Sequence, residues 1–131
     1  MHFRPRALVT ALLLPLSLLS ACDSPLDPFE PEINATQDNF QLQATGVTGV
    51  TSTLSWNWTN TGTRASIDHS TVTTAGNARV VIRDGAGVVV YDHALAPSLN
   101  EPTEAGTAGS WNIQLRMDRY SGTLNFRAQK L

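Results

Sequence analysis

The sequence predicts an all-β protein, with a single antiparallel β-sandwich of about seven strands that follows a signal peptide and an extended, proline-rich acidic tether. Two observations predict the sandwich. From residue 39 onward, short runs alternate apolar and polar side chains, which is the period of two that a strand with one buried face produces. Gly, Asn and Asp separate these runs at short intervals, and no stretch has the helical period.

The N-terminal segment has the plan of a secretory signal peptide. Arg4 and Arg6 precede an apolar run from Ala7 to Leu19, and small residues close the run. The run is roughly 13 residues long and contains Pro15, whereas a membrane-spanning helix needs about 20 apolar residues. We therefore expect residues 1–21 to be a signal peptide rather than a membrane span.

The four residues Leu19-Ser20-Ala21-Cys22 resemble the lipobox of bacterial lipoproteins, which is an aliphatic residue, a small residue, Gly or Ala, and an invariant Cys. The resemblance implies cleavage before Cys22, a diacylglyceryl group on the Cys22 thiol, and acylation of the new amino terminus by a fatty acid such as palmitate. It implies an exported protein of the bacterial cell envelope that is anchored to a membrane through its lipid. Asp23 resembles the inner-membrane retention signal of enterobacterial lipoproteins, but this rule varies between lineages, so the choice of membrane stays open.

Cys22 is the only cysteine in the chain. An exported domain without a second cysteine has no disulfide framework, and its stability must come from an apolar core. A domain of roughly 95 residues can bury enough apolar surface to fold alone, because unaided folding becomes difficult only below about 40 residues.

The segment after the anchor is expected to be a spacer. Pro25, Pro28 and Pro31 recur at regular spacing with acidic residues between them, and proline favours extended conformations over helix or sheet. We assign residues 22–36 to the lipidated cysteine and a flexible tether that reaches about 40 Å when extended. Residues 37–131 form the sandwich domain.

The charge balance excludes one class of partner. The chain has a net charge of −2, and it becomes more acidic when the two arginines of the signal segment are removed. Nucleic-acid binding depends on Lys and Arg contacts to phosphate, and the chain has no basic stripe. We therefore expect no nucleic-acid partner.

Seven strands are expected within residues 40–44, 54–58, 65–69, 78–83, 88–91, 111–117 and 124–128. Asp84-Gly85 between two β-branched runs is the clearest hairpin signal, because both residues tolerate the positive φ of tight turns. Gly46 to Gly49 and Tyr120 to Gly122 are expected to be turns that end strands. The C-terminus follows the last strand directly, so we expect it to be tied into a sheet.

The last two expected strands are similar to the closing hairpin of small secreted bacterial sandwich modules. The resemblance is carried by residues 108–115 (AGSWNIQL) and 120–126 (YSGTLNF). Those modules include immunoglobulin-like domains and the jelly-roll domains appended to exported peptidases. The resemblance implies a sandwich architecture and no activity.

Two Asp-His pairs are the candidate chemistry: Asp68-His69 and Asp92-His93. Adjacent side chains in a strand point to opposite faces, so neither pair can form a dyad by itself. His69 and His93 from different strands, with a carboxylate, would suit a hydrolase or a zinc ion. No ligand spacing supports this, so we assign no catalytic residue, no metal and no cofactor.

Scattered carboxylates suit calcium, which accepts oxygen ligands from separate segments. Asp84, Glu101 and Glu104 are the candidates, but no defined calcium loop is present. The long loop from Ala96 to Gly109 is the candidate binding segment, because long loops on rigid sandwiches often carry function. It is equally explained as a crossing between the two sheets. Its candidate binding residues are Asn100, Glu101, Thr103 and Glu104.

The expected function is that of a non-enzymatic, lipid-anchored envelope protein that binds a protein or glycan partner or has a structural role. One alternative is a metal-dependent or hydrolytic envelope enzyme that uses the Asp and His residues. A further alternative is a glycan-binding module, since Trp56 and Trp58 lie two apart on one face of a strand. Their other interpretation is that they belong to the core, because the opposite face of the strand is polar.

Overall fold

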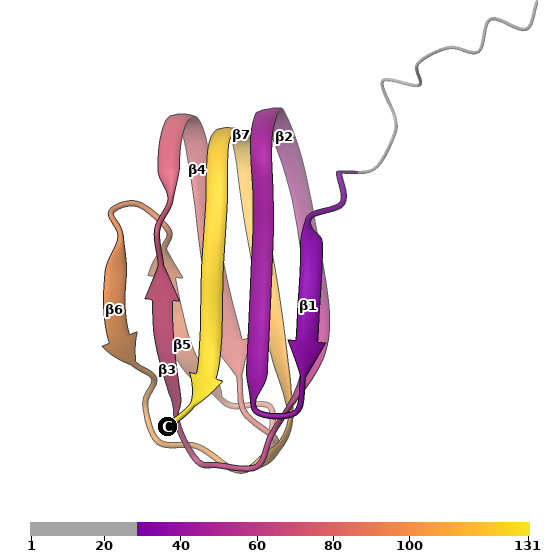
Figure 1. Cartoon of the computed structure of the whole chain (residues 1–131), viewed down its shortest axis with the longest axis vertical. Coiled ribbons are helices and arrows are strands. Elements are labelled where there is room, and N and C mark those ends of the chain that lie inside the picture. Colours follow the sequence, from indigo (N-terminus) through magenta and orange to yellow (C-terminus); the bar gives the residue numbers. More distant parts are fainter. Residues whose placement is uncertain (1–28) are drawn as a thin grey trace, which may run out of the picture.

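The computed structural model describes residues 29–131, which form seven strands in a single antiparallel sheet (Figure 1). The strands are β1 (Glu32–Thr36), β2 (Asn39–Asn60), β3 (Ala65–His69), β4 (Val72–Arg83), β5 (Val89–Ala94), β6 (Leu99–Pro102) and β7 (Gly109–Lys130). The predicted all-β antiparallel class is confirmed. Within residues 29–131 no helix has the length and apolar character to cross a bilayer. The expected signal peptide, lipobox and Cys22 anchor lie outside the described residues.

The sheet folds over on itself because β2 and β7 are long and bend together. Each strand has 22 residues, and the two pair along most of their length. In Figure 1, β2, β4 and β7 arch at one end and return behind themselves. One layer contains β1, the first half of β2, the last part of β7, β3 and β6, and the other contains the second half of β2, the first part of β7, β4 and β5. The arrangement is sandwich-like.

The bends correct two expected turns. Residues 46–49 lie inside β2, and residues 120–122 lie inside β7, so neither segment ends a strand. The chain bends there through shifts in register while the strands stay paired on both sides of each shift. Gly122 has φ 148°, and a Cβ atom at this position would lie 2.0 Å from the Val72 carbonyl oxygen. An interruption in alternation therefore marks a bulge as readily as a strand end.

The core lies between the two layers and is aromatic at its centre. The Phe40 ring packs edge-on against Phe126, and Trp58 packs edge-on against Trp111, with centroids about 6 Å apart in both pairs. Trp58 and Trp111 are buried, which confirms the core interpretation for both. Trp56 is only half-buried, and its ring lies 6.1 Å from that of Phe40.

The sheet begins earlier than expected. β1 pairs with β2 from Glu32 onward, so the boundary between tether and domain lies at residue 32 and not at residue 37. Pro31 is the last proline of the expected tether, so each of the next five residues has a backbone N–H group that can pair in the sheet. Ile33 is half-buried against the core and fixes the register opposite Leu42.

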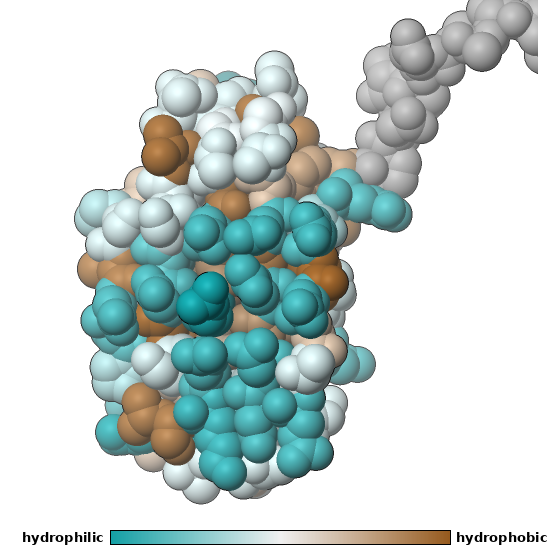
Figure 2. All heavy atoms as spheres, viewed as in Figure 1, coloured by the Kyte–Doolittle hydropathy of each residue, from teal (hydrophilic) through white to brown (hydrophobic). Residues whose placement is uncertain are grey.

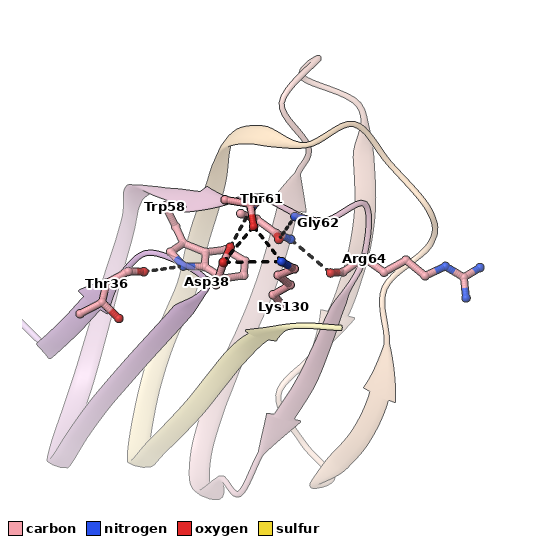
Figure 3. Close-up of polar contacts among 8 residues, drawn as sticks. Thr36, Asp38, Trp58, Thr61, Gly62, Arg64 and Lys130 are labelled. Atoms are coloured by element: carbon pink, nitrogen blue, oxygen red, sulfur yellow. Dashed lines mark hydrogen bonds and ion pairs between the residues drawn. The ribbon is translucent and has the colours of Figure 1, made fainter.

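Hydrogen bonds tie three chain segments together at the end of the sandwich opposite the bends (Figure 3). The Asp38 carboxylate accepts hydrogen bonds from the Thr61 backbone N–H at 2.7 Å and from the Thr61 hydroxyl at 2.9 Å. Lys130 donates to the Thr61 hydroxyl at 3.0 Å. The Leu131 N–H donates to the Arg64 carbonyl, so the expectation that the C-terminus is tied into the sheet is confirmed.

The expected hairpin around Asp84-Gly85 is also confirmed. β4 and β5 pair from Arg79 opposite Ala94 to Arg83 opposite Val89, and across the turn the Asp84 N–H donates to the Val88 carbonyl at 2.9 Å.

The outer face of the nearer layer is mainly hydrophilic (Figure 2). Every second residue of its strands faces solvent there, as in Gln41, Asn125 and Arg127. This alternation is the pattern from which the strands were predicted.

Candidate functional site

The long loop after β5 is a crossing between the two layers that carries an edge strand. It leaves β5 in one layer and forms β6 in the other, where residues 99–102 pair with β3. Beyond β6, the Glu104 N–H donates to the Val90 carbonyl of β5 at 2.9 Å. The crossing therefore closes one end of the open side between β5 and β6.

A recess of about 260 Å³ lies on this side of the sandwich. Residues 89–93 of β5 line one wall, and Glu101, Pro102 and Glu104 line the other. We call this feature the β5–β6 recess. Tyr91 faces inward here and is buried opposite Ile82, whereas His93, on the same face of β5, is exposed.

Three side chains in the recess are in close contact. The Tyr91 ring lies against the His93 ring, with centroids 4.6 Å apart. His93 Nε2 lies 3.4 Å from Glu101 Oε1. Behind them, His69 is buried in the core at the end of β3, on the same inner face as Glu101. His69 on β3 and His93 on β5 therefore belong to different layers, and His93 lines the recess whereas His69 does not.

Several buried polar atoms of this cluster have no hydrogen-bond partner among the described residues. They are the Tyr91 hydroxyl oxygen, Glu101 Oε1 and both ring nitrogens of His69. Only 4% of Tyr91 and 1% of His69 is exposed, so bulk solvent does not pair these groups freely. Leaving a buried polar group unpaired costs about 1–3 kcal/mol, and such groups are rare in native proteins.

Burial also sets the protonation of the cluster. It raises the pKa of the Tyr91 hydroxyl far above its usual range, and the nearby Glu101 carboxylate raises it further. Burial lowers the pKa of His69, although the nearby Leu95 backbone and the Asp68 and Glu101 carboxylates oppose the shift. At neutral pH the Tyr91 hydroxyl therefore keeps its proton, and the buried imidazole of His69 is neutral.

The two aspartates of the Asp-His pairs do not join the cluster. Asp68 is exposed while His69 is buried, so the pair points to opposite faces as predicted. Asp92 forms an ion pair with Arg79 on the outer side of the hairpin. Within the described part of the chain, no three His, Cys, Asp or Glu side chains are grouped to hold a metal ion.

The four candidate binding residues are placed differently from one another. Glu101 and Glu104 line the recess, whereas Asn100 is exposed on β6 opposite Asp68. Thr103 is 3% exposed, and its hydroxyl accepts from the Ala65 N–H and donates to the Glu104 carbonyl. Thr103 therefore holds the crossing to β3 and is not open to a ligand.

Tyr91 is the residue of the recess that the sequence did not single out. The expected strand ended at Tyr91, whereas β5 runs to Ala94, so the spacing of two that places Tyr91 and His93 on one face was not recognised. The partner strand was the missing information, because β6 was expected to be loop.

Asp84, a calcium candidate, has a structural role. Its Oδ1 atom accepts from the N–H groups of Ala86 and Val88, both at 2.9 Å, and its Oδ2 atom accepts from the Thr107 N–H at 2.8 Å. These bonds, led by that from Thr107, hold the pKa of Asp84 below its usual range. The carboxylate fastens the hairpin turn to the crossing segment.

The two tryptophans do not form a flat platform. Trp58 is buried, and its indole N–H donates to the Thr36 carbonyl at 3.0 Å (Figure 3). Trp56 instead lines a groove of about 310 Å³ together with Phe29 and Leu54. Phe29 packs against the core there and partly covers the open side near β1.

Comparison with known proteins identifies no relative from which a function could be transferred. No family model, no curated protein and no solved structure matches the chain. The functional assignment therefore depends on the residues of the recess and on the N-terminal sequence.

Proposed function

We propose that this protein is a lipid-anchored component of the bacterial cell envelope whose sandwich domain binds a protein or glycan partner through the β5–β6 recess, without catalysing a reaction. The observation that carries the proposal is the open recess itself, with His93, Glu101 and Glu104 in its lining. The lipobox resemblance at Leu19 to Cys22 supports the anchor.

The residues around the recess support a binding role. Thr103 and Asp84 are also buried polar residues of this part of the fold, and their side-chain oxygens are hydrogen-bonded to backbone groups. The buried polar side chains that hold these segments together are therefore hydrogen-bonded to the backbone. A buried polar group without a partner is rare in a native protein and calls for an explanation, and a binding role is the explanation proposed here.

The place of the recess in the sheet suits a tethered protein. The sheet order is β1-β2-β7-β3-β6, so β1 and β6 lie at opposite edges. The described chain begins beside β1, and the recess lies beside β6. A tether that enters at β1 leaves the recess side open to a partner.

The anchor is tested by labelling cells with a palmitate analogue and fractionating them. We expect the wild-type chain to carry the label and to sediment with membranes. Cys22→Ser should lose the label and leave the membrane fraction, whereas Ser24→Ala, two residues away, should retain both properties. Labelling of Cys22→Ser would contradict the proposed anchor.

Binding is tested by cross-linking in native envelopes and by co-sedimentation with purified cell-wall glycan. We expect one of the two assays to capture the wild-type protein, and we expect Glu101→Gln to reduce that capture. Asp118→Asn is the matched control, because Asp118 is an exposed acid in the bend of β7, away from the recess. Equal capture of all three proteins would remove the recess as the binding site.

A further inference from the structure

The second half of β2 has an edge with no partner strand. Residues 52–60 pair with β7 on one side, and no strand within residues 29–131 pairs with them on the other (Figure 1). We infer that this edge pairs with the same edge of a second copy of the chain, in an antiparallel dimer whose two-fold axis passes between the two Ser55 residues. Such a dimer goes beyond the proposed function, because β2 and β5 lie at opposite edges of their layer and the recess lies beside β5.

The backbone groups of this edge are available for pairing. The Thr59 carbonyl points away from β7, since it accepts a hydrogen bond from the Asp38 N–H at 2.9 Å. Backbone directions alternate along a strand, so the N–H and C=O groups of Thr53, Ser55 and Asn57 also point away from β7. None of these three residues has a backbone partner on that side among residues 29–131. They form a row of open donors and acceptors.

The other edges of the sheet carry features that hinder such pairing. β1 and β6 have only five and four residues, and a proline lies at each, Pro31 just before β1 and Pro102 at the end of β6. The pairing of β5 has a register shift, and its Val90 carbonyl already accepts from the Glu104 N–H. Short strands, prolines, bulges and covering segments prevent association of sheet edges. Residues 52–60 of β2 have no charge, no proline and no register shift, so this edge is unprotected.

The edge is complementary to itself in the register centred on Ser55. Thr53 then lies opposite Asn57 of the second copy, and Ser55 lies opposite its own counterpart. All three are open positions, so the three hydrogen-bonded pairs give about six interchain hydrogen bonds. Leu54 lies opposite Trp56 of the second copy, in a non-hydrogen-bonded position where side chains approach most closely. Polar residues therefore meet polar residues on one face, and apolar residues meet apolar residues on the other.

The groove beside Trp56 gives space for these apolar side chains. It has a volume of about 310 Å³, and Phe29, Leu54 and Trp56 supply its apolar lining together with Pro31. Leu54 and Trp56 are only half-buried in one copy, so pairing removes apolar surface from water, which is favourable. Glu30, the charged residue of the lining, is exposed, so its carboxylate can stay in water at the rim.

A dimer of this kind is closed and suits a tethered protein. Each copy uses the same edge, and the remaining edges are hindered, so no third copy is added. The described chain begins at Phe29, in the groove itself, so both chains enter beside the interface. Two copies with the proposed anchor could therefore reach one membrane, where tethering raises their effective concentration.

The register is tested by single cysteines in the full chain, oxidised both in native envelopes and after purification. Cα atoms of a hydrogen-bonded antiparallel pair lie about 5.5 Å apart, within the range of about 4.4–6.8 Å found in disulfides. Ser55→Cys should therefore give a covalent dimer on a non-reducing gel, several-fold more than Thr53→Cys. The two copies of residue 53 would lie about 13 Å apart along the strands, too far for a disulfide. Mixing Thr53→Cys with Asn57→Cys should restore the cross-link. The wild type, whose only cysteine is Cys22, is the blank.

A proline variant tests the same ladder without a cross-link. Ser55→Pro removes an N–H that points away from β7, so the pairing of β2 with β7 is retained, whereas Ser55→Ala keeps the N–H. The mass of the purified full chain is measured by sedimentation equilibrium in a density-matched non-ionic detergent. We expect the wild type and Ser55→Ala to approach twice the monomer mass as concentration rises, and Ser55→Pro to stay monomeric. If Ser55→Pro does not fold, as judged by circular dichroism, Ser55→Lys replaces it, because two like charges would then lie opposite each other.

The two assays decide between the dimer and a free edge. Cross-linking at Ser55 but not at Thr53, together with a wild-type mass that Ser55→Pro reduces, supports the dimer. Equal cross-linking of Ser55→Cys and Thr53→Cys, or a wild type that stays monomeric at all concentrations, would overturn it. Neither outcome alters the expected effect of Glu101→Gln on capture, so the dimer and the recess are tested separately.

Discussion

Asp84 and Tyr91 are both buried polar residues of the β4–β5 hairpin, but their hydrogen bonding is opposite. Asp84 is 5% exposed, and both of its carboxylate oxygens accept hydrogen bonds from backbone N–H groups. Tyr91 is 4% exposed, and its hydroxyl has no partner among the described residues. Equal burial therefore does not imply an equal role.

The difference separates buried polar groups that stabilise the fold through hydrogen bonds to the backbone, such as the Asp84 carboxylate, from buried polar groups that do not, such as the Tyr91 hydroxyl. Asp84 joins the hairpin turn to the segment after β6, so losing its carboxylate would leave three backbone donors unpaired. Tyr91 belongs to the core through its ring. Burial of its hydroxyl costs free energy of desolvation, which the adjacent Glu101 carboxylate offsets in part.

The largest expected effect is that of Asp84→Ala. The N–H groups of Ala86, Val88 and Thr107 would lose their acceptor, and the turn would separate from the crossing segment. We expect the melting temperature to fall by roughly 10 °C, measured by circular dichroism. The control is Asp118→Ala, an exposed acid whose loss should change the melting temperature little. A similar melting temperature for both variants would contradict the structural role of Asp84.

Acid should reveal the same carboxylate in the unmodified protein. Backbone N–H groups, first that of Thr107, lower the pKa of Asp84 in the folded state. The unfolded state then binds the proton more readily. The stability that Asp84 provides is present above its unfolded pKa of about 4 and is lost as the pH falls through the lower folded pKa. Urea denaturation at a series of pH values should show this loss in the wild type and less of it in Asp84→Asn.

A smaller effect distinguishes the two buried tyrosines directly. The Tyr120 hydroxyl lies 3.3 Å from the Val72 carbonyl and 3.4 Å from the Thr123 carbonyl, within hydrogen-bond distance of both. Tyr120→Phe should therefore lower the free energy of unfolding by about 1 kcal/mol. Tyr91→Phe should leave it unchanged or raise it by up to about 1 kcal/mol, because the lost hydroxyl had no partner. Urea denaturation measures both values.

An equal loss in the two variants would show that the Tyr91 hydroxyl is paired in solution, and the comparison with Asp84 would fail. A gain in stability for Tyr91→Phe together with weaker capture from native envelopes would strengthen it. That combination is the trade-off between stability and function expected of a binding residue.

The sequence predicted the layers of this fold better than its strand ends. Alternation correctly placed the buried faces around Trp58 and Trp111, because a period of two reports which side of a strand is apolar. It did not predict that β2 continues through Gly46 or that β7 continues through Gly122. A bulge interrupts the alternation just as a turn does, and only the partner strand distinguishes the two.

The site was predicted in pieces and not as a whole. The opposite directions of Asp68 and His69 followed from strand geometry, and Glu101 was named as a binding candidate. The meeting of Glu101 with Tyr91 depends on β6, a four-residue strand that contains a proline and has little β-branched character. Such an edge strand forms because β3 offers it unpaired backbone groups, which is a tertiary effect that local sequence does not carry.

The smallest expected effect comes from His69 and concerns the range between pH 5 and 7. Burial lowers the pKa of His69 in the folded state, so the unfolded state takes up the proton first, at its pKa of about 6.5. The free energy of unfolding should thus be constant above about pH 6.5 and fall as the pH decreases below it, by at most about 1.4 kcal/mol per pH unit for one group. In His69→Leu this fall should disappear, whereas His93→Gln, at an exposed position, should keep it. Urea denaturation at closely spaced pH values measures the slope, and an unchanged slope in His69→Leu would show that folding does not lower the pKa of His69.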